Sequence, residues 1–318
     1  MNRDDVQWRG YFAALPTPFT REGSLDTAAL QDTTKLFIEQ GAHGLLVNGS
    51  TGEWTAQTVD ERRQVAEVVI AEADGRIPVL VSATAPDLAT SVALIRHADV
   101  VGADSVLLTP PPGARLTDPE LEWYYRTAFG ETGLPTWLYN FPQESNSNLS
   151  IPLIGKLALI ENVVAIKQSS PDDREFYETI RAVGDQLVVF GHMLSRVGLG
   201  LIHARQGGDG HFGSGMPLGA KMPMFFEHAW RGEIDEAAQI ADQFEQLMKA
   251  IRQGGDGYNW RHGGMQAALK AVMNLQGQSG GYPREPKLPI TDYDALEAIA
   301  TALRGAGIDL TDRRRSDV

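Results

Sequence analysis

The sequence predicts a closed (β/α)8 barrel, a TIM barrel, followed by a C-terminal extension of three helices. Two observations carry this prediction. Eight short apolar runs, each about the length of a buried parallel strand, alternate with longer segments of helical periodicity. Beyond Trp230 the strand signal stops and only helical periodicity continues. Strict alternation of strand and helix is typical of parallel α/β folds, and eight repeats favour a closed barrel.

The predicted strands are apolar runs bounded by turn residues. They cover Tyr11–Leu15, Gly44–Asn48, Pro78–Ser82, Ser105–Thr109, Pro135–Tyr139, Val163–Lys167, Leu187–Gly191 and Gly208–Phe212. A doubly wound sheet is the alternative fold, but it would typically carry a phosphate-binding loop after its first strand. Here that turn reads Pro16-Thr17-Pro18, and proline has no N–H to donate to a pyrophosphate.

The first helices have recognisable start and stop signals. Thr27–Gln40 places Leu30 and Phe37 on one face and is followed by Gly41, a typical helix stop. Thr58–Glu61 has the pattern of a capping box, which satisfies the free N–H groups of a helix start.

A third start is expected at Asp118, an acid that would cap the helix and precede Pro119 at its first position. The later helices of the barrel are expected at Ile151–Leu159, Asp173–Val183, Leu194–Arg205 and Pro217–Trp230, and those of the extension at Glu233–Arg252, Gly264–Leu275 and Tyr293–Arg304. We therefore expect a catalytic barrel over residues 8–231, a helical extension over 232–305 and a polar tail over 306–318.

Composition excludes several classes of protein. The 318 residues include no cysteine, so disulfides, thiolate nucleophiles and cysteine-ligated metals are absent. Lys and Arg number 28 against 41 Asp and Glu, a net charge of −13 that disfavours nucleic-acid binding, despite Arg313–Arg315 in the tail. No run of 18 apolar residues and no signal peptide is found, so we expect a soluble, cytoplasmic protein without membrane contact.

The chemistry is expected where the strands end, because barrel enzymes act at the C-terminal ends of their strands. Lys167 ends the apolar run Val163–Ile166, and a lysine in a dry barrel mouth would keep more free amine to attack a carbonyl. Tyr139 ends another strand and could relay a proton. A salt-bridged lysine and a buried structural tyrosine are the plainer alternatives for these two residues.

The turn Gly49-Ser50-Thr51-Gly52 offers hydroxyl and backbone N–H groups that suit a small carboxylate. Taken with the lysine and the tyrosine, it resembles the pyruvate-dependent class I aldolase family that contains dihydrodipicolinate synthase and N-acetylneuraminate lyase. That family has Gly-(Ser/Thr)-Thr-Gly-Glu after strand two, Tyr-Asn-x-Pro after strand five, and a Schiff-base lysine 28 positions after the tyrosine. This chain has Gly49–Glu53, Tyr139–Pro142 and Lys167, which is 28 positions after Tyr139.

The resemblance implies a mechanism and a set of site residues. Lys167 would form an imine with a 2-oxo acid, Tyr139 would move protons, and Thr51 would link the tyrosine to the site. Gly49, Ser50 and Thr51 would bind the substrate carboxylate, while Gly191 and the Phe212 carbonyl would line the pyruvate pocket. It also implies no metal or organic cofactor, and a homo-oligomer, either a tetramer or a dimer.

The chain departs from the named members at the second half of the site. An arginine that binds the second substrate's carboxylate in dihydrodipicolinate synthase is replaced by Glu144, and the tyrosine lent across its subunit interface is absent from Thr109–Pro112. The acidic pair of N-acetylneuraminate lyase is replaced by His192-Met193. These departures argue against lysine biosynthesis and against sialic-acid cleavage. Glu144 should repel a distal carboxylate and favour a neutral, hydroxylated or cationic second half.

The hypothesis is a Schiff-base lyase that makes or breaks a bond in a 2-oxo acid, with pyruvate as the common half and a second substrate that is not an acidic semialdehyde. A dehydratase of a 2-keto-3-deoxy sugar acid is one alternative, and a non-catalytic 2-oxo acid binding protein is another. His192 and His211 could approach each other at the mouth as substrate ligands. Gly208–Gly213 matches a dinucleotide motif by letter, but it lies late in the chain, with Pro217 close behind it and no clear acidic partner.

Overall fold

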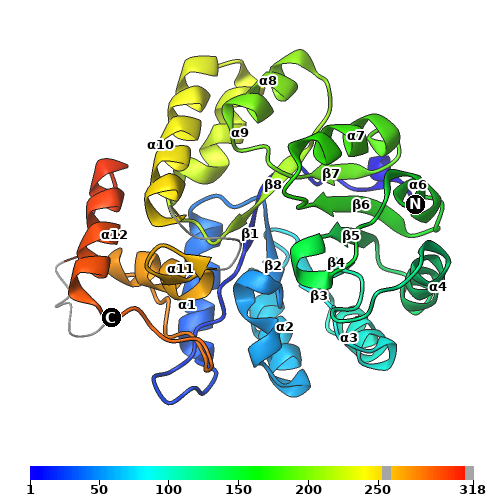
Figure 1. Cartoon of the computed structure of the whole chain (residues 1–318), viewed down its shortest axis with the longest axis horizontal. Coiled ribbons are helices and arrows are strands. Elements are labelled where there is room, and N and C mark those ends of the chain that lie inside the picture. The colour runs from blue at the N-terminus through cyan, green and yellow to red at the C-terminus, as the bar shows by residue number, and fades with distance from the viewer. Residues whose placement is uncertain (253–258, 312–318) are drawn as a thin grey trace.

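Eight parallel strands close into a barrel in the computed structural model, which describes residues 1–252 and 259–311 (Figure 1). The strands follow one another around the barrel in sequence order, and β1 pairs with β8 to close it. The predicted fold is therefore confirmed. Arg313–Arg315 of the predicted tail lies outside the described residues.

Every predicted strand is present, with ends shifted by at most two residues. The observed strands are β1 (Gly10–Ala14), β2 (Gly44–Val47), β3 (Val79–Ser82), β4 (Ser105–Leu108), β5 (Thr136–Asn140), β6 (Val163–Gln168), β7 (Val188–Phe190) and β8 (Gly210–Ser214). The start of β8 differs from the predicted Gly208 because Gly207 and Gly208 have φ of +96° and +83°. Two successive residues with positive φ interrupt the extended backbone that a strand needs.

The helices alternate with the strands as expected. They are α1 (Thr27–Glu39), α2 (Val59–Ala73), α3 (Leu88–Val100), α4 (Asp118–Phe129), α5 (Pro142–Ser145), α6 (Ile151–Leu157), α7 (Asp173–Val183), α8 (Arg196–Ala204) and α9 (Lys221–Arg231), followed in the extension by α10 (Ile234–Arg252), α11 (Met265–Leu275) and α12 (Tyr293–Gly305). Two short strands, β9 (Asn259–Trp260) and β10 (Gly263–Gly264), form a hairpin before α11.

Five helix starts differ from the predictions, and those of α10 and α11 do so by only one residue. Thr117, not Asp118, is the N-cap of α4, because Thr117 and Glu120 form a capping box and Pro119 is the second helical residue. Helix α8 begins at Arg196 because the Ser195 hydroxyl accepts the N–H of Gly198. Helix α9 begins at Lys221 and not at Pro217.

Aromatic rings fill the inside of the barrel. Phe12, Trp137, Phe190 and Phe212 contact one another with ring centroids 5.0 to 6.2 Å apart, and Trp8 stacks on Trp137. These rings and their aliphatic neighbours are separate from the larger core between strands and helices. The barrel is therefore solid below its mouth, and substrate can only approach from the strand ends.

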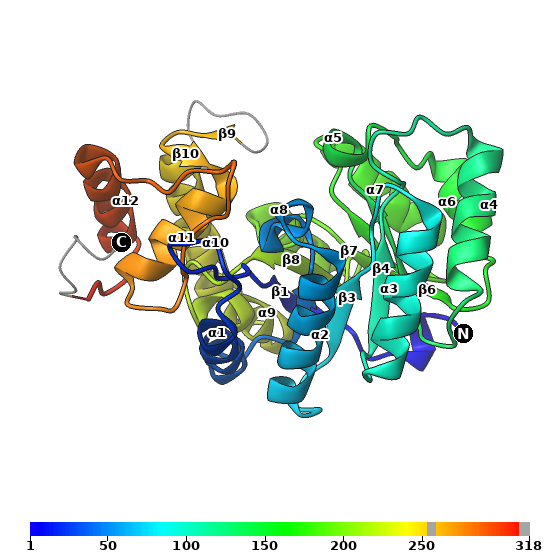
Figure 2. The ribbon, with the colours of Figure 1, turned by 90° about the horizontal axis from the view of Figure 1, so that it is seen from below.

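The extension lies beside one side of the barrel, at the end of the molecule opposite α4 and α6 (Figures 1 and 2). Figure 2 shows the β9–β10 hairpin and α5 rising on the same side of the molecule. Helix α11 also contacts the 3-10 turn Ser50–Gly52 that follows β2. The extension thus reaches the mouth of the barrel.

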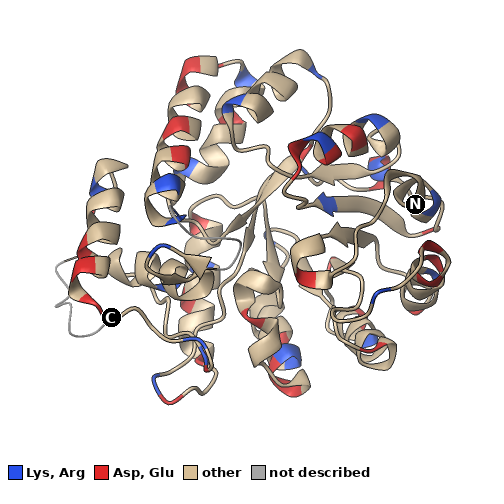
Figure 3. Cartoon of the chain, viewed as in Figure 1, with Lys and Arg blue, Asp and Glu red and all other residues tan. Residues whose placement is uncertain are grey.

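Charged residues are concentrated on the helices and leave the barrel strands almost bare (Figure 3). Acidic and basic side chains are mixed on the helices, so no single-sign face stands out in this view. Among the described residues, no helix has the length and apolar character needed to cross a bilayer.

Replacing Gly213 by alanine should destabilise the barrel. A Cβ there would lie 1.6 Å from the Tyr11 hydroxyl, which donates a 2.6 Å hydrogen bond to Gly215 O, so this buried ring would have to move. We expect Gly213→Ala to lower the free energy of unfolding by about 1–3 kcal/mol, measured by urea denaturation. Gly155→Ala is the control, because a Cβ there meets open space in α6 and should stabilise the helix by about 0.5–1 kcal/mol. Equal effects of the two changes would contradict the packing argument.

Candidate active site

Lys167 lies at the mouth of the barrel, on β6 beside Tyr139 of β5, with which it is in register. Its ammonium nitrogen is 4.1 Å from the centroid of the Tyr139 ring and 4.9 Å from that of Phe212. Two aromatic faces therefore flank the amine where bulk water would otherwise solvate it. Such contacts orient the side chain toward the barrel axis.

Desolvation by burial lowers the pKa of Lys167 from 10.5 to about 7, and the negative charge of Glu144 opposes this shift. Burial is the larger effect because a charged ammonium loses more solvation than one carboxylate returns. At neutral pH a large fraction of Lys167 is consequently a free amine, the form that attacks carbonyl carbon.

Tyr139 has its hydroxyl in a network of serines. Burial raises its pKa well above the usual value, and the nearby Glu144 carboxylate raises it further, while hydrogen bonds with Ser169 and Ser50 act in the opposite direction. The phenol therefore stays protonated at neutral pH. Phe141 stacks on the ring at 5.6 Å and fixes its plane. The hydroxyl can give a proton to, or accept one from, a group bound next to Lys167.

The turn after β2 is held in an unusual shape by its two ends. Asn48 and Glu53 both have φ of +58°, a left-handed conformation that few residues other than glycine adopt. Between them Ser50–Gly52 forms one 3-10 turn, and a Cβ at Gly52 would lie 3.1 Å from the carbonyl oxygen of Leu15. The backbone N–H groups at the start of such a turn are suited to an anion.

Glu144, from the short helix α5, closes onto this turn. Its carboxylate accepts a hydrogen bond from the Ser50 hydroxyl and one of 2.6 Å from the Trp54 indole N–H. The Trp54 ring is therefore held in place by a polar contact with Glu144. Ser50 connects Glu144 with Tyr139, so the three side chains respond to one another.

Thr51 is buried and donates a 3.3 Å hydrogen bond to the Ser214 hydroxyl of β8. Ser50, on the same turn, lowers the pKa of Tyr139 through a hydrogen bond. The link through Thr51 that the resemblance implies stays a prediction. Ser214 and Ser169 were missed by the sequence analysis. Single serines at strand ends carry no signal in a sequence until their neighbours are known.

The remaining expected site residues occupy three different surroundings. Gly191 lies under the Phe176 ring, which a Cβ would approach to 2.3 Å, so only glycine fits. Phe212 faces the amine of Lys167. His192 is exposed, and its Nε2 is 3.4 Å from the carbonyl oxygen of Ser170.

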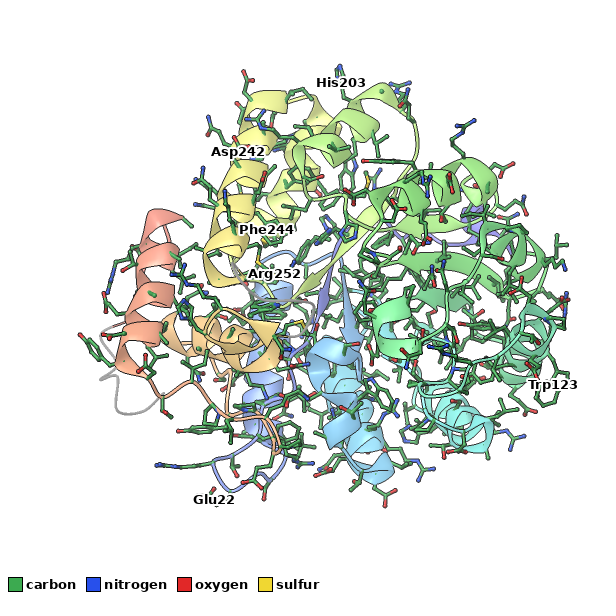
Figure 4. All side chains as sticks on the ribbon, in the orientation of Figure 1. Glu22, Trp123, His203, Asp242, Phe244 and Arg252 are labelled. Carbon is green, nitrogen blue, oxygen red and sulfur yellow. The ribbon has the colours of Figure 1, made fainter. Side chains whose placement is uncertain are left out.

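His211 lies on the outer side of β8, between the rings of Tyr11 and Phe244, the latter on the barrel-facing side of α10 (Figure 4). Burial, with a smaller repulsion from His192, lowers its pKa to about 3, so the imidazole is neutral. A packing role fits this histidine better than substrate binding. Within the described ranges, no group of three or more acidic or histidine side chains is placed to hold a metal ion.

The extension anchors the turn through Glu53. The Glu53 carboxylate forms a fully buried 2.5 Å ion pair with Lys270 of α11. It also accepts a hydrogen bond from the backbone N–H of Arg284. Arg284 also pairs with Glu61 on α2 at 2.6 Å. Gln266, one helical turn before Lys270, donates a 3.0 Å hydrogen bond to Ser50 O. Gln266 and Arg284 were not predicted, because nothing local marks a side chain that reaches across to another segment.

The sequence model of the dihydrodipicolinate synthetase family matches residues 7–304. The chain belongs to this family. Its members are class I, pyruvate-dependent lyases, and this chain is an enzyme of that class.

Relatives named as lyases, synthases and aldolases support the family membership. An uncharacterized DapA-like lyase of Rhizobium meliloti is 30% identical over 307 residues, covering 94% of this chain and 95% of the relative. A 4-hydroxy-tetrahydrodipicolinate synthase of Bradyrhizobium diazoefficiens is 27% identical, covering 95% and 98%. A probable 2-dehydro-3-deoxy-D-pentonate aldolase of Escherichia coli is 28% identical over 250 residues, covering 76% and 81%.

Solved structures of the family share the fold. The crystal structure of dihydrodipicolinate synthase from Aquifex aeolicus has a TM-score of 0.84 at 24% identity, covering 96% of this chain and all of that one. A monomeric dihydrodipicolinate synthase variant has a TM-score of 0.83 at 25% identity, covering 95% and 98%. The barrel and its extension are thus the arrangement of the family.

The amine of Lys167 should titrate near neutral pH. We expect its acetylation by acetic anhydride, followed by peptide mass spectrometry, to be half-maximal at a pH of about 7, compared with about 10.4 for an ordinary lysine. Glu144→Gln removes a charge that raises this pKa, so the profile should move to lower pH. Glu22→Gln, at the outer edge of the molecule (Figure 4), is the control and should leave it unchanged. A midpoint near 10 in the unmodified protein would contradict the desolvation argument.

Proposed function

We propose that this protein is an aldolase that forms an imine between Lys167 and a 2-oxo acid, releasing or adding pyruvate. The observation that carries the proposal is the Lys167 amine, whose pKa burial lowers to about 7, 4.1 Å from the Tyr139 ring. A reactive amine beside a protonated phenol is the pair that carbonyl condensation needs.

The proposed steps balance in atoms and protons. The Lys167 amine attacks C2 of the 2-oxo acid, and the carbinolamine loses its hydroxyl as water to give the iminium. The C3–C4 bond then breaks: its electron pair moves to C3 and into the iminium to form an enamine, and the C4 hydroxyl loses its proton and becomes an aldehyde. Protonation at C3 and hydrolysis release pyruvate and restore the amine. Tyr139 carries protons at the carbinolamine and C4 steps.

The substrate carboxylate is proposed to bind at the turn after β2. The backbone N–H groups of Ser50 and Thr51, next to Gly49, supply donors without adding a charge, whereas the two hydroxyls already donate to Glu144 and Ser214. Gly191 and the Phe212 carbonyl would border the same pocket, with Gly191 packed closely against the Phe176 ring. His192, being exposed, would contact only the outer end of a long substrate.

The second half of the substrate is proposed to be neutral and hydroxylated. Glu144 places a carboxylate beside the Ser50–Trp54 turn and would repel an acidic aldehyde. The similarity to a probable pentonate aldolase favours carbon–carbon cleavage of a sugar acid. Dehydration of a 2-keto-3-deoxy sugar acid would use the same imine and would be recognised by loss of water without release of pyruvate.

Borohydride reduction in the presence of pyruvate tests the imine. We expect intact mass spectrometry to show one reduced pyruvyl group, and peptide mapping to place it on Lys167. Lys167→Ala should abolish the adduct, whereas Lys156→Ala, an exposed lysine on α6, should retain it. The proposal fails if the native protein forms no adduct. An adduct without turnover of any 2-oxo-4-hydroxy acid would instead indicate a binding protein.

The charge at position 144 should set the preference for the aldehyde half. We expect Glu144→Arg to raise the ratio of kcat/KM for an aldehyde that carries a carboxylate over a neutral one by about tenfold or more, because repulsion becomes attraction. Glu22→Arg, an exposed position at the outer edge of the molecule (Figure 4), is the matched control for net charge. Initial rates of pyruvate consumption with the two aldehydes measure the ratio. An unchanged ratio would show that Glu144 does not face the second substrate.

A further inference from the structure

A small pocket lies between the turn after β2 and the C-terminal extension. It has a volume of about 190 Å³ and is lined by Ser50, Trp54, Thr55, Glu144, Gln266 and Lys287. Two of these residues, Ser50 and Glu144, also belong to the network around Tyr139 and Lys167. The pocket therefore borders the reacting centre, and the extension forms its outer wall.

Gln266 brings an unpaired acceptor to this pocket. The residue is only 4% exposed, and its Nε2 donates a 3.0 Å hydrogen bond to the carbonyl oxygen of Ser50. Its Oε1 has no hydrogen-bond partner in the described part of the chain. An unpaired buried carbonyl costs about 1–3 kcal/mol, which a ligand that donates a hydrogen bond would recover.

The ammonium group of Lys287 is a hydrogen-bond donor at the wall of this pocket. Its side chain is half-buried in the loop before α12, and it forms no ion pair with the residues that the structure describes. Lys270 and Arg284, the cations near it, are already paired with Glu53 and Glu61. An ammonium with free N–H groups at a pocket wall is placed to donate to ligand oxygens.

The combination of groups selects the chemistry of the ligand. The carboxylate of Glu144 and Oε1 of Gln266 accept, the ammonium of Lys287 donates, and Trp54 adds an apolar ring. A hydroxyl both donates and accepts, so neighbouring hydroxyls can satisfy all of these groups. A carboxylate only accepts, so it would leave Oε1 of Gln266 unpaired and would meet the charge of Glu144.

We propose that this pocket binds the distal hydroxyls of the 2-oxo acid and that Lys287 and Gln266 determine specificity for a polyhydroxylated chain. This inference rests on the proposed function and names the substrate class: a sugar acid with hydroxyls beyond C4. The extension then has a direct part in substrate choice, in addition to anchoring the turn. The imine itself needs neither residue, because its chemistry is assigned to Lys167, Tyr139 and the turn after β2.

The test compares two substrates in matched variants. Pyruvate release is measured from 4-hydroxy-2-oxopentanoate, which ends in a methyl group, and from a six-carbon 2-keto-3-deoxy sugar acid with hydroxyls at C5 and C6. Lys287→Met should lower kcat/KM for the sugar acid about tenfold or more and leave the short substrate unchanged. Lys287→Arg should restore most of the loss because it keeps a charged donor. Lys35→Met, an exposed lysine on α1, is the control.

The outcomes separate this inference from the proposed function. The pyruvate adduct on Lys167 is trapped with borohydride in every variant, which also reports that each one is folded. An adduct in all variants with unchanged selectivity in Lys287→Met overturns the pocket assignment and leaves the imine mechanism standing. The pocket assignment is also overturned if Lys287→Met lowers kcat/KM equally for both substrates. The same holds if the native protein releases pyruvate from neither substrate. Absence of the adduct from the native protein overturns the mechanism itself.

Discussion

The buried ion pair between Glu53 and Lys270 is the contact on which the arrangement of the site depends. Both side chains are withdrawn from solvent, at 0% and 1% exposure, and the oxygen and nitrogen are 2.5 Å apart. Removing one partner of such a pair leaves a buried charge, which costs about 3–5 kcal/mol. Desolvation lowers the pKa of Lys270 to about 8, and Glu53 counters this by favouring the charged form. The pair therefore fixes the turn after β2 against the extension.

A second constraint is the dryness of the barrel mouth. Aromatic side chains fill the barrel below Lys167, and Tyr139 and Phe212 flank its amine. The same environment lowers the pKa of the lysine and raises that of the tyrosine, because burial disfavours the charged form of each. Both groups are thus neutral in large part near pH 7. A neutral amine and a neutral phenol can therefore lie side by side at the mouth of the barrel.

Helices were predicted well from the sequence where their start and their apolar face are marked by residues close together in the chain. Thr58 and Glu61 form the predicted capping box at the start of α2, and Asp173–Val183 is a helix with the predicted bounds. Errors of one to four residues occurred at helix starts such as that of α9, because the extra residues before it are apolar but form a turn. Periodicity reports which residues face the core, and it does not report where the backbone hydrogen bonds begin.

The sequence by itself determined the barrel, the family and the position of Lys167, because strand–helix alternation and motif spacing are properties of the chain order. Only the tertiary structure decided that Ser50 joins Glu144 to Tyr139, and that Gln266 and Lys287 border the same pocket. Glu144 is 94 positions from Ser50 along the chain, and Gln266 is 216 positions from it. Nothing local in a sequence encodes such distances; they follow from barrel closure, which brings strand ends together, and from the ion pair that holds the extension over them.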